Sequence, residues 1–195
     1  MNPASEPPKS PPPASPSPGA VLILDEAAIE RALKRIAHEV IERNPDLKRV
    51  ALVGIPSRGV EIARRLAEYI GQFEDVRPFS GAVDVSMHRD DLHTRGRIRP
   101  VQPTQLPDSL DDKTLVLCDD VLFSGRTCRA AMDSISSFGR PARIQYAALI
   151  DRGHRELPIR ADYVGKNVPT QFNERVYVRL RAVDGVPDSV WIERS

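Results

Sequence analysis

The chain has 195 residues, of which 41% are hydrophobic and 28% are charged, and its formal net charge is +1. This length is typical of one globular domain with an additional segment, and the near-zero charge excludes a uniformly basic coat for nucleic acid. No apolar run of about 18 residues occurs, which excludes a membrane-spanning helix. The only two cysteines, Cys118 and Cys128, are too few for a disulfide scaffold and are typical of a protein of the reducing cytoplasm.

Prolines are concentrated at the start of the chain. Eight of the 18 prolines lie within residues 1–20, where Ala and Ser fill most of the other positions. Proline has no backbone N–H and the segment has little apolar bulk, so we expect a disordered tail that is either simply solvated or a ligand for a proline-recognising domain. The folded unit is therefore predicted to span residues 21–195.

Apolar spacing predicts alternating strands and helices through the folded unit. Apolar residues three or four apart predict a first helix that begins at Asp25 and ends at Asn44 and Pro45. The elements predicted after it are a buried strand at 50–55, a helix at 60–70, a strand at 81–87, a loop at 88–113, a strand at 115–118, a helix at 126–138, a strand at 143–150, a short strand at 161–164 and a half-exposed strand at 175–181. This order favours an α/β fold with a parallel sheet covered on both faces, whose ligands bind at the carboxyl ends of the strands.

The most informative segment is residues 115–127. It combines a buried strand, the adjacent carboxylates Asp119 and Asp120, and a small-residue turn that opens a helix. The N–H groups and the dipole of a helix start suit a phosphate dianion, and Ser124 and Thr127 add hydroxyl donors. Because two carboxylates repel a phosphate, we expect ribose hydroxyls or a hydrated Mg²⁺ between them.

A second turn, at residues 54–59, follows the neighbouring predicted strand. It offers a hydroxyl from Ser57, a guanidinium from Arg58 and another helix start. A guanidinium can bind a diphosphate through two parallel hydrogen bonds, so this turn is a candidate diphosphate site.

Residues 115–127 resemble the phosphoribosyl pyrophosphate (PRPP) signature of type I phosphoribosyltransferases. Residues 31–39, 87–92 and 151–170 resemble the PyrR family, whose members regulate pyrimidine-operon mRNA and have uracil phosphoribosyltransferase activity. The resemblance covers nearly all of residues 21–195 but not the proline-rich segment. It implies the type I phosphoribosyltransferase fold, which is a mostly parallel central sheet flanked by helices, with a small hood and a flexible flap loop.

The resemblance also implies a reaction in which uracil and PRPP give UMP and pyrophosphate. It assigns catalysis to Asp119, Asp120 and Arg58, with Mg²⁺ held by PRPP, by waters and, as candidate ligands, by the two carboxylates. The residues assigned to PRPP or UMP are Ser57, Arg58, Arg89, Val121, Leu122, Phe123, Ser124, Gly125, Arg126, Thr127, Arg152 and Val176. Arg89 would lie on the flap. A structural ion pair for Arg152 and core packing for Val176 remain open.

Two segments are locally basic despite the balanced total. Residues 31–49 hold six Arg or Lys against three acids, and residues 152–181 hold seven against three. A folded RNA hairpin is the expected partner of such surfaces, and a stacking platform for single strands is not, because no aromatic interleaving is evident. By resemblance, the leader mRNA of the pyrimidine operon would bind, with UMP or UTP promoting it, at Arg35, His38, Arg43, His154, Arg155, Arg160 and Lys166.

Two other functions compete with this dual one. A nucleotide-sensing RNA regulator with vestigial catalysis is disfavoured by the intact Asp119 and Asp120, and a salvage enzyme without an RNA role is disfavoured by the match at Arg35 and Arg155. If the two surfaces are separate, Arg155→Ala weakens RNA binding and spares UMP formation. Family members assemble as dimers, tetramers or hexamers, so we expect a homo-oligomer.

Overall fold

The computed structural model describes residues 17, 19–86 and 103–194. Most of the proline-rich segment 1–20 and residues 88–102 of the predicted loop lie outside these residues. Arg89 therefore lies outside the described part of the chain, and its assignment to a flap stays a prediction.

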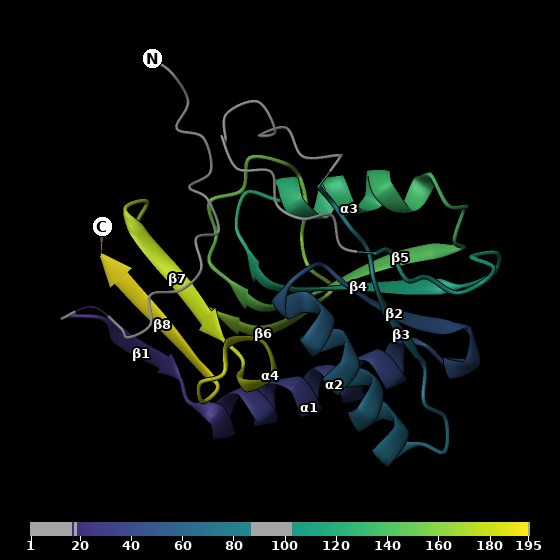
Figure 1. Ribbon diagram of the computed structural model, residues 1–195, viewed down its shortest axis with the longest axis horizontal. Coiled ribbons are helices and arrows are strands. Elements are labelled where there is room, and N and C mark those ends of the chain that lie inside the picture. The colour runs from purple at the N-terminus through teal and green to yellow at the C-terminus, as the bar shows by residue number, and fades with distance from the viewer. Residues whose placement is uncertain (1–16, 18, 87–102, 195) are drawn as a thin grey trace.

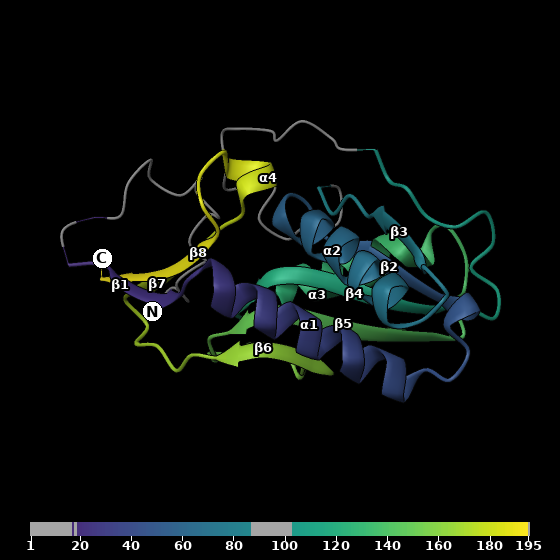
Figure 2. The ribbon, with the colours of Figure 1, turned by 90° about the horizontal axis from the view of Figure 1, so that it is seen from below.

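The centre of the fold is a five-stranded parallel sheet in the order β3-β2-β4-β5-β6 (Figure 1). Its strands are β2 (Val50–Gly54), β3 (Phe79–Ala82), β4 (Thr114–Leu122), β5 (Arg143–Asp151) and β6 (Tyr163–Asn167). The helices are α1 (Glu26–Arg43), α2 (Arg58–Phe73) and α3 (Arg126–Ser136), with a single 3₁₀ turn, η1 (Leu47–Arg49), before β2. Figures 1 and 2 show α1 and α2 on one face of the sheet and α3 on the other, so the predicted α/β fold with two covered faces is confirmed.

The core divides along the alternation of side chains in the strands. Leu52 and Val116 point to the face covered by α1 and α2, whereas Ala51, Val53 and Leu117 pack with the residues of α3. Because successive strand residues point to opposite faces, a parallel strand between two helical layers must be apolar at every position. This is why β2 and the first half of β4 are continuous apolar runs in the sequence.

A second sheet of three antiparallel strands, in the order β1-β8-β7, forms the predicted hood. Its strands are β1 (Val21–Leu24), β7 (Glu174–Arg179) and β8 (Ser189–Arg194), and the short helix α4 (Arg181–Asp184) follows β7. Both views show this sheet on the side of the carboxyl ends of the central strands. The pattern of the sequence predicted only β7 among these strands. β1 has only four residues, and β8 places Val190, Trp191 and Ile192 in a row without alternating apolar and polar positions.

Several predicted boundaries were wrong, among them that of the strand predicted at 161–164, which is β6 at Tyr163–Asn167. The strand predicted at 81–87 is β3 at Phe79–Ala82, and the strand predicted at 115–118 is the longer β4. The second helix begins at Arg58 rather than at residue 60. The last two differences matter for the site, because the two aspartates belong to the end of β4 and Arg58 opens α2. Among the described residues, no helix has the length and apolar character needed to cross a membrane.

An ion pair between Arg65 of α2 and Asp188 ties the hood segment to the central sheet. Burial alone raises the pKa of the Asp188 carboxyl, but hydrogen bonds from Arg65 and from the backbone N–H of Arg181 outweigh burial and hold that pKa below its usual range. A carboxyl whose pKa is lowered by folding stabilises the protein above its unfolded pKa and loses this contribution as the pH falls through its folded pKa.

We therefore expect Asp188→Asn to lower the free energy of unfolding by about 2 kcal/mol near neutral pH, with the difference shrinking below about pH 4. Urea denaturation near neutral pH and below about pH 4 measures this difference in the free energy of unfolding. Asp111→Asn, at an exposed position, is the control. A difference that does not change with pH would contradict the assignment.

Candidate active site

The two turns singled out in the sequence lie side by side because their strands are neighbours. Strands β2 and β4 pair in parallel with Gly54 opposite Cys118, and the N–H of Ile55 donates to the carbonyl of Cys118 over 2.8 Å. The peptide bond between Pro56 and Ser57 is cis. A Cβ at Gly59 would lie 2.2 Å from the Cys118 carbonyl oxygen, so the close approach of α2 to β4 requires glycine there.

Asp119 and Asp120 are both buried at the carboxyl end of β4. One oxygen of Asp119 accepts from the N–H of Asp120 over 2.9 Å, and the other accepts from the hydroxyl of Tyr146 over 3.2 Å. Burial, followed by the charge of Asp119, raises the pKa of Tyr146 well above its ordinary value, so this hydroxyl stays a donor at neutral pH. Asp120 accepts from the N–H of Val121 over 3.0 Å. Both carboxylates are thus held in place by donors.

The turn after β4 has the features of an anion site. Gly125, at φ +93°, is the N-cap of α3 and has no side chain to cap the first N–H groups of the helix. The buried Ser124 accepts from the N–H of Arg126 over 3.4 Å, and Thr127 is buried in the first turn of α3. Leu122 is buried in the core beneath α3, whereas Val121 packs against the core beneath α1 and α2. These two residues therefore support the turn by packing.

One edge of the Arg58 guanidinium is already engaged within the fold. Its Nε donates to Asp184 of α4 over 3.0 Å and its Nη2 donates to the same carboxylate over 2.6 Å, so one edge of the guanidinium is already bound bidentately. Its Nη1 lies 3.9 Å from Oδ2 of Asp120. The side chains of Arg58 and Asp184 are only 15% and 12% exposed, respectively.

Arg152 is buried at the end of β5 and lies over the ring of Phe123, with Cζ 4.3 Å from the ring centroid. Its guanidinium donates to the hydroxyl of Thr170 and to the carbonyl of Glu174. These contacts place it directly beside the turn after β4, and the acceptors just named are neutral. Val176 of β7 is partly buried against the core beneath α1 and α2, which agrees with core packing.

The donor set at the end of β4 fits a hydrated Mg²⁺. Among the described residues, no group of three or more His, Cys, Asp or Glu side chains could hold a metal ion by itself. Mg²⁺ commonly takes one or two carboxylates and completes its shell with waters and substrate phosphates, and Asp119 and Asp120 supply such a pair. The two cysteines are unpaired and buried, and burial raises the pKa of Cys128 to about 12, so both act as packing residues.

Arg35 and Arg43 of α1 contact the backbone of β6 and of the residue before it, and Arg160 and Lys166 flank these contacts in the chain. We call these four residues, all assigned to RNA, the α1–β6 surface. Arg35 of α1 donates to the carbonyls of Val164 and Gly165, directly before Lys166, and Arg43 donates to the carbonyl of Asp162. Arg160 and Lys166 are exposed. His38 instead faces α2, where its ring stacks on Phe73 at 4.1 Å.

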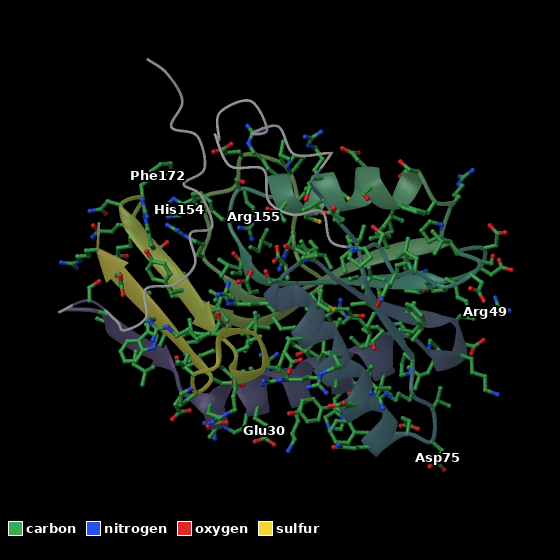
Figure 3. All side chains as sticks on the ribbon, viewed as in Figure 1. Glu30, Arg49, Asp75, His154, Arg155 and Phe172 are labelled. Atoms are coloured by element: carbon green, nitrogen blue, oxygen red, sulfur yellow. The ribbon has the colours of Figure 1, made fainter. Side chains whose placement is uncertain are left out.

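Arg155 and His154 lie together in the loop after β5 (Figure 3). Arg155 forms an ion pair with Asp151 and donates to the carbonyls of Phe123 and Ile159 over 2.8 and 2.9 Å. Ring nitrogen Nε2 of His154 lies 2.6 Å from the carbonyl oxygen of Thr170. Arg155 is therefore bonded to the turn after β4 and is not a purely external cation.

Aromatic rings contact three of the residues assigned to RNA, although no aromatic interleaving was evident in the sequence. His38 stacks on Phe73, Arg43 lies 5.1 Å from the ring centroid of Tyr163, and His154 meets the edge of the exposed Phe172 at 5.4 Å. Phe73 comes from a different helix, so no local pattern could show the first contact. Tyr163 and Phe172 lie within the second basic segment and were a signal that sequence reasoning missed.

Sequence reasoning also missed three residues that contact the site: Tyr146, Glu156 and Asp184. In the sequence, Tyr146 looks like one more buried position of an apolar strand. Asp184 follows a half-exposed strand and belongs to no motif. Their roles are evident only from long-range contacts: Tyr146 donates to Asp119, Asp184 accepts from Arg58, and Glu156 accepts from Arg126.

Comparison with known proteins agrees with this geometry. The model of the phosphoribosyl transferase domain family matches residues 22–179. The Bifunctional protein PyrR of Chloroflexus aurantiacus is 58% identical over 173 residues, covering 89% of this chain and 95% of the relative. The chain belongs to the PyrR family of phosphoribosyltransferases.

Other PyrR relatives give the same result. The Bifunctional protein PyrR of Leifsonia xyli is 53% identical, covering 89% of this chain and 97% of the relative, and that of Listeria monocytogenes is 51% identical, covering 90% and 97%. The family resemblance seen in the sequence is therefore confirmed.

Solved structures support the fold alone. A hypoxanthine phosphoribosyltransferase of Trypanosoma cruzi superimposes with a TM-score of 0.66 at 17% identity, covering 89% of this chain and 91% of that one. One of Staphylococcus aureus gives 0.60 at 22% identity, covering 78% and 80%. Both are phosphoribosyltransferases, so the expected type I fold of this PyrR family member is confirmed.

Proposed function

We propose that this chain transfers the phosphoribosyl group of PRPP to uracil, giving UMP and pyrophosphate, and regulates the pyrimidine operon by binding its leader mRNA. The observation that carries the enzymatic part is the meeting of two helix-opening turns at adjacent strand ends, with Asp119 and Asp120 beside Arg58. The naming of relatives at 51–58% identity as bifunctional supports the second activity.

Different residues of the chain stabilise the positive and the negative charges that develop in the reaction. As the bond from the anomeric carbon to the diphosphate breaks, positive charge develops on the ribose, and the buried carboxylates of Asp119 and Asp120 stabilise it while binding the ribose hydroxyls. Residues 124–127 bind the 5′-phosphate through the start of α3. Ser57 and Arg58 bind the diphosphate. Arg152, whose guanidinium lies over the ring of Phe123, contacts the nucleotide. Asp119 and Asp120 would be the candidate protein ligands of Mg²⁺, which would supply positive charge to the leaving diphosphate when bound.

Nucleotide control of RNA binding has a direct structural route. The carbonyl of Ser124, in the phosphate turn, accepts from the N–H groups of Glu156 and Leu157 over 3.0 and 3.1 Å. The guanidinium of Arg126 also bonds to Glu156 over 2.6 Å. Segment 153–159, which holds two residues assigned to RNA, is therefore bonded to the turn that binds the phosphate of UMP. A nucleotide that prefers one arrangement of this contact shifts the RNA-binding segment with it.

We expect Glu156→Gln to reduce the gain in RNA affinity on adding UMP by about threefold, because an exposed charge pair contributes up to about 1 kcal/mol. RNA affinity is measured by fluorescence anisotropy with and without saturating UMP. By linkage, the effect of RNA on UMP affinity must fall by the same factor. An unchanged gain would show that the pair of Arg126 and Glu156 carries no coupling.

We expect Lys166→Ala to weaken RNA binding about fivefold and to reduce the salt dependence of binding by about one counterion, since an exposed lysine contacts phosphate rather than a base. UMP formation should not change. RNA affinity is measured over a series of salt concentrations. An equal loss of affinity at every salt concentration would place Lys166 outside the RNA backbone contact.

A paired experiment on one preparation tests the whole proposal. It measures UMP formed from uracil and PRPP, and UMP-dependent binding to the leader RNA of a pyrimidine operon. Absence of both activities overturns the assignment. RNA binding without catalysis would identify a regulator with vestigial catalysis, and catalysis without RNA binding a salvage enzyme. The cytoplasmic location and the homo-oligomeric state stay predictions, to be measured by fractionation and light scattering.

A further inference from the structure

Asp184 carries no signal in the sequence, yet it makes the shortest contacts of Arg58. It is the last residue of α4, which Figure 2 shows beside α2. Its Oδ2 accepts from the N–H of Leu180 over 2.8 Å and from Nε of Arg58 over 3.0 Å, while Oδ1 accepts from Nη2 of Arg58 over 2.6 Å. A carboxylate with a backbone donor on one oxygen is itself fixed in orientation.

This pair decides which edge of Arg58 faces the site. A guanidinium has five N–H groups, and Asp184 engages that of Nε and one of Nη2. The second N–H of Nη2 and one N–H of Nη1 form the other two-donor edge, and Nη1 is the atom nearest to Asp120. Since both side chains are largely buried, alternative rotamers of the arginine are restricted. An arginine held in one orientation loses less conformational entropy when it binds an anion.

We propose that Asp184 is a positioning residue, which orients the guanidinium of Arg58 so that its Nη1–Nη2 edge receives the diphosphate of PRPP. The inference rests on the proposed function, in which Arg58 binds that diphosphate. Asp184 does not touch the substrate in this account. Asp184 affects the reaction only through Arg58. Its loss is therefore expected to change the binding of PRPP and pyrophosphate and not that of uracil.

The test compares Asp184→Ala, Asp184→Asn, Arg58→Ala and the double variant with alanine at both positions. We expect Asp184→Ala to raise the KM for PRPP, and for pyrophosphate in the reverse reaction, about tenfold while the KM for uracil stays unchanged. Asp184→Asn should recover part of this loss, because the amide oxygen still accepts one hydrogen bond. In the Arg58→Ala background, removing Asp184 should have no further effect on the KM for PRPP.

A matched control separates positioning from general support of the hood. Asp188→Asn weakens the neighbouring tether to Arg65 and should leave the KM for PRPP unchanged. If Asp184→Ala does not fold, Asp184→Asn alone should still raise the KM for PRPP severalfold. An unchanged KM in a folded Asp184 variant, or the same rise in the absence of Arg58, overturns the proposal.

Direct binding keeps this inference distinct from the proposed function. Calorimetric titration of wild-type protein with PRPP and Mg²⁺ requires no turnover. If no UMP forms but PRPP binds, the proposed reaction is wrong, and the inference is judged by whether Asp184→Ala weakens PRPP binding about tenfold. If PRPP does not bind to the wild type, both proposals are overturned.

Discussion

Replacing Asp120 by asparagine is expected to lower the kcat for UMP formation about a thousandfold while leaving RNA affinity in saturating UMP unchanged. The substitution keeps the size of the side chain and its bond from the N–H of Val121, and it removes only the negative charge. In a buried site that charge is worth far more than in water, and losing one preorganised electrostatic contact to the transition state commonly costs a factor of 10² to about 10³. Asp120 lies at the end of β4 and takes no part in the α1–β6 surface.

Steady-state kinetics with uracil and PRPP, together with anisotropy on the leader RNA, measure the two effects on one preparation. Asp111→Asn, the same chemical change at an exposed position before β4, is the matched control and should alter neither. If Asp120→Asn kept a tenth or more of the wild-type kcat, Asp120 would not carry the charge stabilisation assigned to it.

Replacing Arg155 by alanine is expected to damage both activities, in contrast to what charge pattern alone predicts. The arginine donates to the carbonyl of Phe123 in the turn after β4, to that of Ile159, and to the carboxylate of Asp151. Its loss leaves a partly buried carboxylate without this partner, which costs about 2–3 kcal/mol of the free energy of unfolding. UMP formation should fall about tenfold or more, because the turn that binds the 5′-phosphate loses a supporting contact.

Arg140→Ala removes an exposed arginine between α3 and β5 and is the control for loss of charge alone. Thermal denaturation, UMP formation and RNA affinity should all stay near wild type in that variant. If Arg155→Ala weakened RNA binding but left stability and UMP formation intact, Arg155 would be an external RNA contact, and the bond to Phe123 would have no functional role.

Local pattern was sufficient for the central layers of the fold. Continuous apolar runs identified β2, β4 and β5, and the spacing of apolar residues after Asp25 identified α1, whose N-cap accepts from the N–H of Ala28 over 2.7 Å as expected. These elements are read from the sequence because burial on one or both faces imposes a period of two or of 3.6 residues. In the hood only β7 alternates apolar and polar residues, whereas β1 has four residues and β8 does not alternate, so neither of these two was predicted.

The candidate site divides in the same way. The order of strand, carboxylate pair and helix start in residues 115–127 is local, so the sequence by itself determined where a phosphate and a ribose are expected to bind. The contacts of the arginines, by contrast, are with residues far away in the sequence. Arg58 donates to Asp184, which is 126 residues away in the sequence, and Arg35 donates to the carbonyl of Val164, which is 129 residues away.

Counting charges in the sequence therefore could not tell an arginine that faces solvent from one that is bound within the fold. A guanidinium carries five donors and a long flexible stem, so its role depends on which acceptors the fold brings within reach. The sequence alone determined the fold class and the composition of the site. Only the tertiary structure decided which edge of Arg58 faces the carboxylates, and that Arg155 supports the phosphate turn.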